Sequence, residues 1–99
     1  MRYIFGLCEG RHTINDVDKY IFNKDFFQEE SSMFDYNYME TQVANVLSTV
    51  TKDDILTVYV TGLTTALVEV IKYCSCHNIT LELMHFNRVT NTYNRQDMF

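Results

Sequence analysis

The segment from Leu56 to Arg88 constrains the fold of this chain more than any other, because two β-rich runs flank a helical stretch. The first run, Leu56 to Val60, ends at a Thr-Gly turn. A helical pattern extends from Thr64 to about His77 and stops at Asn78, and a second β-rich run covers Ile79 to Phe86. This order predicts a right-handed parallel βαβ crossover. Its turn leaves free backbone N–H groups at a helix N-terminus, which is where anions bind.

The N-terminal segment predicts a third strand. From Tyr3 to Cys8 the sequence is almost wholly apolar, which is typical of a strand buried on both faces of a parallel sheet. Glu9 and Gly10 end this run, and Gly10 allows a turn. Arg11 and His12 therefore follow the C-terminal end of the first strand.

Residues 13–32 have no sustained hydrophobic period, because asparagine and aspartate interrupt it repeatedly. Residues 20–22 fit either a short strand or one helical turn, and Phe26-Phe27 form a second apolar pair. We interpret the segment as an excursion of about twenty residues that covers one end of the sheet. A connection this long in a small domain either has a function, as a lid or interface, or contains an unrecognised element.

Two helices are expected. In the first helix, we expect Ser32 to be the N-cap. Asp35 would then occupy the third helical position, near the positive end of the helix dipole. One face of it carries an apolar stripe formed by Met39, Val43, Val46, Leu47 and Val50. In the helix from Thr64, the residues expected in the core are Leu67, Val70, Ile71 and Cys74, with Val68 and Tyr73 widening the apolar arc.

The C-terminal residues predict an antiparallel strand at the edge of the sheet. Residues 88–92 read as a hairpin connection in which Asn91 supplies a positive φ. Tyr93 to Met98 then return along the third strand. The expected fold is α/β and small Rossmann-like: one domain over residues 1–99, with a three-stranded mostly parallel sheet, two helices and the C-terminal hairpin strand.

Charge and composition exclude several classes of protein. A net charge of −5 argues against a broad surface for extended nucleic acid or for anionic membranes. No apolar stretch approaches the ~20 residues of a membrane span, and no signal-peptide pattern follows Met1. We therefore expect a soluble, cytoplasmic protein without a membrane partner.

The three cysteines do not predict a metal site. On a helix, Cys74 and Cys76 point roughly 200° apart and cannot share one ion. We favour Cys74 in the core and Cys76 near the helix end, and we expect no bound metal and no cofactor.

The polar residues that follow the three predicted parallel strands converge on one edge of the sheet, where open α/β sheets bind ligands. The candidate binding residues are Arg11, His12, Thr61, Gly62, Thr64, Thr65, His85, Asn87 and Arg88. Arginines, histidines, hydroxyls and a helix N-terminus together predict a receptor for an anion, and phosphate fits best.

Each candidate also has an ordinary structural role. A threonine after a glycine turn caps a helix without any ligand, and histidines are common at surfaces. Arg88 could pair with Glu82 or Asp97 across the hairpin. No known catalytic motif is present, so catalytic residues are not assigned. A histidine beside threonines and an arginine permits phosphodiester cleavage but does not indicate it.

At Val58–Leu67 and Leu83–Arg88 the chain resembles the small Rossmann-like domains of CRISPR systems (the CARF-type sensors and compact ring nucleases) and short phage-encoded counter-defence proteins. The resemblance covers about a third of the chain. It implies a homodimer that holds a cyclic oligonucleotide or a related signal nucleotide, with Thr61, Gly62, Thr64 and Thr65 as the phosphate loop. The chain departs from the larger sensors by lacking an effector domain.

Our functional hypothesis is therefore the binding of a small anionic nucleotide, in a homodimer. Aromatic residues in excess of what one helix needs motivate the dimer: Phe26, Phe27, Phe34, Tyr36 and Tyr38. One alternative is an acidic protein-binding inhibitor of the anti-CRISPR type, favoured by the acidic stretch from Asp25 to Glu30. A second alternative is a phosphodiesterase of the ring-nuclease type.

Overall fold

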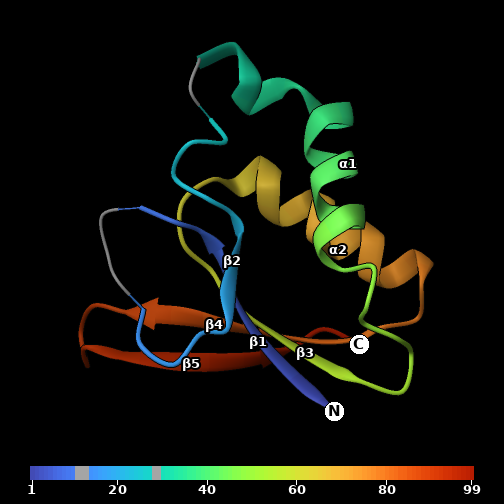
Figure 1. The fold of residues 1–99 in the computed structure, drawn as a ribbon. Helices are drawn as coiled ribbons and strands as arrows, with labels where there is room; N and C mark the ends of the chain where they lie inside the picture. Colours follow the sequence, from blue (N-terminus) through green and yellow to red (C-terminus); the bar gives the residue numbers. More distant parts are fainter. Residues whose placement is uncertain (11–13, 28–29) are drawn as a thin grey trace.

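A computed structural model describes residues 1–10, 14–27 and 30–99 (Figure 1). In chain order its elements are β1 (Arg2–Cys8), β2 (Lys19–Phe22), the 3-10 helix η1 (Glu30–Phe34), α1 (Tyr36–Val46), β3 (Ile55–Tyr59), α2 (Thr64–Cys76), β4 (Thr80–Asn87) and β5 (Thr92–Asp97). The strands of the described residues form one sheet in the order β2-β1-β3-β4-β5. β5 is antiparallel to β4, and the other neighbours are parallel. The α/β class is confirmed.

The predicted number of strands is wrong, because residues 20–22 belong to an edge strand. β2 runs parallel to β1, with Gly6 opposite Tyr20 and Cys8 opposite Phe22. β2 is only four residues long, too short to show an alternating pattern in the sequence. The excursion of residues 13–32 therefore contains a strand.

Both helices cover the same face of the sheet (Figure 1). Side chains alternate between faces along a strand, so the fully buried Leu56 and Val58 of β3 share a face with their partners Leu81 and Leu83 of β4. α1 and α2 contribute the buried residues Met39, Val43, Val70 and Cys74 to the same core.

α1 begins later than predicted. Its N-cap is Asp35, whose side chain accepts a hydrogen bond from the Tyr38 backbone N–H at 3.1 Å. Ser32 instead lies in η1, where its carbonyl accepts a hydrogen bond from the Asp35 N–H at 3.2 Å. The apolar stripe is confirmed at Met39 and Val43, and after the helix at Leu47 and Val50, all buried, whereas Val46 is only half-buried.

α2 matches the prediction closely at its ends. It starts at Thr64, and Asn78 follows it with a φ of 56°. Val70 and Cys74 are fully buried, and Leu67 and Ile71 pack half-buried against the core.

The buried face of α2 differs from the prediction at two positions. Val68 lies on the outside, 46% exposed. Glu69, which we did not expect in the core, is buried, and its carboxylate pairs with the Lys72 ammonium at 3.2 Å.

On the helix-free face, the amino-terminal half of the sheet carries a charged network. The Thr57 hydroxyl donates a hydrogen bond to the Glu82 carboxylate, and Arg2 pairs with the same oxygen. These contacts, the Thr57 bond first, lower the pKa of Glu82. Arg95 pairs with Asp97 at 3.4 Å. Neither acidic residue that we considered for Arg88 is therefore its partner among the described residues.

Among residues 1–10, 14–27 and 30–99, no helix has the length and apolar character needed to cross a membrane.

Candidate functional site

A hollow of about 950 Å³ lies where β3 and β4 end and the β4–β5 hairpin turns. Its lining residues are Val60, Thr61, Gly62, His85, Phe86, Arg88, Asn91 and Tyr93. Four of them are candidates from the sequence, namely Thr61, Gly62, His85 and Arg88. The parallel strands thus bring together residues that lie more than twenty positions apart in the chain.

The turn after β3 is attached to the end of β1. The Thr61 hydroxyl accepts a hydrogen bond from the Cys8 N–H at 3.2 Å and donates one to the Cys8 carbonyl at 2.7 Å. Gly62 follows with a φ of 80°, a conformation that favours glycine. Thr61 therefore positions the turn, and its hydroxyl is already both donor and acceptor in hydrogen bonds with the backbone of β1.

The N-cap residue of α2 is Leu63, whose side chain cannot cap the backbone N–H groups of the first turn. Thr64 is exposed at this end. The Thr65 hydroxyl donates a hydrogen bond to the Met33 carbonyl in η1 at 2.9 Å, so it links α2 to η1. Of the predicted phosphate loop, Thr61 and Gly62 line the hollow, and Thr64 and Thr65 do not.

The end of β4 contributes one histidine and one cation. His85 Nε2 lies 2.7 Å from the Gln96 amide oxygen. Because an amide oxygen only accepts hydrogen bonds, Nε2 is the donor in this contact. Arg88 is exposed and makes no ion pair within the described part of the chain.

Asn87, a further candidate from the sequence, has a different role. The Asn87 side chain accepts hydrogen bonds from the N–H groups of Val89 and Thr90 at 3.0 and 3.4 Å, so it stabilises the hairpin turn. It does not line the hollow. Arg11 and His12 fall outside the described residues.

Two aromatic residues of the hollow were not predicted from the sequence. Phe86 and Tyr93 face each other across β4 and β5, with ring centres 5.3 Å apart. The Tyr93 ring also meets Tyr59 edge-on at 4.7 Å. Burial, and then the neighbouring Tyr59 and Tyr20, raise the pKa of Tyr93, so its phenol is neutral at physiological pH. The cross-strand register that joins Phe86 to Tyr93 is the signal that could have found them.

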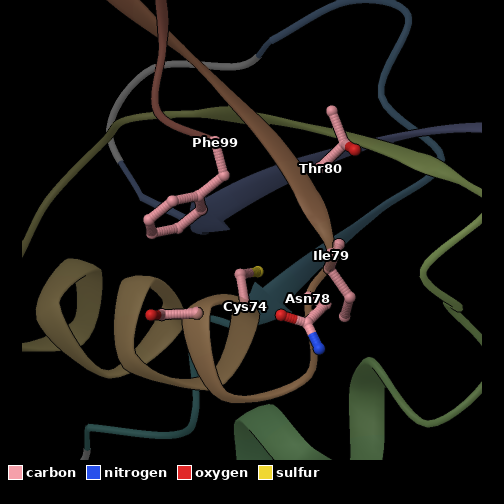
Figure 2. A pocket seen from close by; sticks show the side chains of 6 residues that line it. Cys74, Asn78, Ile79, Thr80 and Phe99 are labelled. Carbon is pink, nitrogen blue, oxygen red and sulfur yellow. The ribbon is translucent and has the colours of Figure 1, made fainter.

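A second cavity, of about 300 Å³, lies at the opposite end of β4, between the end of α2 and the C-terminal Phe99 (Figure 2). The Cys74 thiol points into it. Burial raises the pKa of Cys74 to about 12, so this thiol is neutral and a poor nucleophile. The described residues that line this cavity carry no charged side chain.

The positions expected for Cys74 and Cys76 are confirmed. Cys74 is buried and Cys76 is exposed on the last turn of α2. Within the described ranges, no group of three histidine, cysteine, aspartate or glutamate side chains has the arrangement of a metal site.

No protein-family model matches this chain, and no curated protein or solved structure matches it either. The resemblance to CRISPR-associated nucleotide-binding domains and to phage counter-defence proteins therefore stays a prediction.

Proposed function

We propose that this domain binds a small anionic nucleotide in the hollow at the carboxyl ends of β3 and β4. The observation that supports this proposal most is the position of Arg88, a cation that makes no ion pair with the described residues and shares the hollow with the rings of Phe86 and Tyr93. A guanidinium binds a phosphate through two parallel hydrogen bonds, and aromatic rings stack on nucleobases. The volume lies within the range of roughly 300–1,000 Å³ that is usual for small-ligand sites.

The electrostatics favour a short ligand. The uncapped first turn of α2 follows Gly62 closely, and its positive end attracts a phosphate. The chain as a whole carries a net charge of −5, which repels a long polyanion. A nucleotide with one or a few phosphates satisfies both conditions.

We propose binding without turnover as the activity. Among the described residues that line the hollow, His85 is the one histidine, and its imidazole could assist phosphodiester cleavage as a general acid or base. Chromatography of the ligand recovered after incubation separates the two activities. Intact ligand supports sequestration, and a linear or shortened product supports the phosphodiesterase alternative.

Replacing Arg88 with alanine should weaken nucleotide binding at least tenfold, because a charge-assisted hydrogen bond contributes about 1.5–3 kcal/mol. The melting temperature of the free protein should change little, since Arg88 is exposed. Calorimetry against mononucleotides and cyclic di-, tri- and tetranucleotides measures the effect. Arg95→Ala is the matched control, because Arg95 is also an exposed arginine of the hairpin but does not line the hollow. Unchanged affinity in Arg88→Ala would contradict the proposed site.

The homodimer remains part of the proposal, but fewer aromatic residues are available for its interface than the sequence indicated. Phe26 and Phe27 pack edge-on against each other, and Tyr38 stacks on Phe26 with ring centres 4.2 Å apart. These three rings therefore pack against one another within the chain, with Phe26 between the other two. Phe34 and Tyr36 remain, with 63% and 51% of their surfaces exposed.

Light scattering at micromolar concentration should report twice the chain mass if Phe34 and Tyr36 form an interface. Phe34→Glu should then release monomers, because a charge replaces an apolar contact. A monomer at every concentration would remove the dimer from the proposal and leave the hollow of each chain as a separate site.

A further inference from the structure

The outer side of β5 is a sheet edge that pairs with no other strand of the described residues. Its six residues match β4 without interruption, from Thr92 opposite Asn87 to Asp97 opposite Glu82, and the chain contains no proline. The bulges and prolines that commonly protect an edge strand are therefore missing from it. We propose that this edge pairs with the same edge of a second copy of the chain, which joins two five-stranded sheets into one. This inference rests on the homodimer of the proposed function and assigns it a different surface.

Alternate residues of β5 have the backbone groups that such a pairing needs. The Met98 N–H donates a hydrogen bond to the Leu81 carbonyl of β4 at 2.9 Å. Because the backbone groups of successive residues in a strand point to opposite sides, those of Gln96 also face β4. The N–H and C=O groups of Arg95 and Asp97 then face outward, away from the sheet. A second antiparallel strand can bond to them.

The charges of the edge select one register for the two copies. Arg95 and Asp97 lie on the same face of the sheet, and with side chains 60% and 70% exposed they form only a surface ion pair, which is easily exchanged. If Gln96 lies on the two-fold axis, Arg95 of each copy is opposite Asp97 of the other. Each such pair exchanges two backbone hydrogen bonds and places opposite charges side by side. With Arg95 or Asp97 on the axis, like charges would face each other.

The same register makes the edge its own complement. In an antiparallel partner, the residue opposite Asp97 precedes the residue opposite Arg95, so the best partner has a basic residue, any residue and then an acidic one. Arg95, Gln96 and Asp97 are that sequence. β5 also carries one charge of each sign, so two edges do not repel each other locally although the whole chain has a net charge of −5. A second copy is therefore the occupant that this edge fits.

The proposed pairing keeps the two hollows apart. The axis at Gln96 is near the C-terminal end of β5, whereas the hollow includes Asn91, in the turn before the strand begins. The two hairpin turns then point away from each other, about 30 Å apart along the strands. Each hollow belongs to one chain, and we expect one nucleotide per chain.

Charge reversal, followed by light scattering on the full chain from micromolar to millimolar concentration, tests this inference. The parent protein should report twice the chain mass. Arg95→Asp and Asp97→Arg should each report the mass of one chain where the parent is dimeric, because each places like charges opposite each other. An equal mixture of the two variants should form dimers again, since each supplies the charge that the other lacks. Lys52→Asp and Asp53→Arg are the matched controls, because both residues are exposed in the loop before β3 and the variants should stay dimeric.

Hydrogen exchange measures whether the backbone takes part. The Arg95 N–H should exchange at least tenfold faster in Asp97→Arg than in the dimeric parent, because it loses its acceptor on the second copy. A monomer at every concentration, a dimer that persists in both single variants, or a mixture that stays monomeric would overturn the edge pairing. If Phe34→Glu releases monomers and Asp97→Arg does not, the interface lies at Phe34 and Tyr36 instead. Nucleotide binding, tested with Arg88→Ala, stands or fails separately from each of these outcomes.

Discussion

Replacing Gly62 with alanine is expected to lower the free energy of unfolding by about 2–4 kcal/mol, from backbone strain and crowding together. The φ of 80° is strained for any residue with a Cβ. A methyl group there would also lie 2.9 Å from the Cys8 Cβ and 3.3 Å from its Sγ. A chain of this length has a total stability of roughly 5–15 kcal/mol, so the loss is a large part of it. Urea denaturation of the two proteins measures it.

Two further variants separate the causes. Gly10→Ala is the matched control, because a methyl group at Gly10 meets none of the described residues within 4 Å, and its stability should change by less than about 1 kcal/mol. Gly62→Asn introduces the same Cβ beside Cys8 but tolerates the left-handed backbone better than alanine. It should therefore be less destabilising than Gly62→Ala. Equal stability of Gly62→Ala and the parent protein would show that the turn does not need glycine.

Periodic apolar patterns made most of the fold predictable. The spacing of Met39, Val43 and Leu47 identified the buried face of α1, and Asn78 and Asn91 marked turns that have positive φ. Two errors have local causes. β2 is four residues long and belongs to the edge of the sheet, where no period can develop. Ser32 and Asp35 are both good N-cap residues, and only the backbone of η1 decides between them.

The candidate site was predictable as far as the ends of parallel strands determine it. Gly62, His85 and Arg88 meet because β3 and β4 are neighbours. The sequence could not show that the Thr65 hydroxyl is bonded to Met33, since that contact depends on how α2 meets η1. We did not assign Phe86 to the site from the sequence, because that step requires the register of β5 against β4.

Replacing Gly6 with alanine is expected to destabilise the protein by about 1–3 kcal/mol, the usual effect of overpacking. A methyl group at Gly6 would lie 2.4 Å from two ring carbons of Tyr20, its partner on β2. The ring cannot move away freely, because the Tyr20 hydroxyl accepts a hydrogen bond from the Ile14 N–H at 3.1 Å. The substitution therefore forces either the strand pairing or this hydrogen bond to change.

The effect of Gly6→Ala on stability should change sign when the Tyr20 ring is absent. In a Tyr20→Ala background, Gly6→Ala should stabilise the protein by about 0.5–1 kcal/mol, because alanine loses less backbone entropy than glycine in a strand. Tyr20→Phe keeps the ring and removes only the hydroxyl, so Gly6→Ala should remain destabilising there. Urea denaturation of the six proteins gives the coupling between the two positions directly. If Gly6→Ala destabilises all three backgrounds equally, the Tyr20 ring is not what excludes a side chain from position 6.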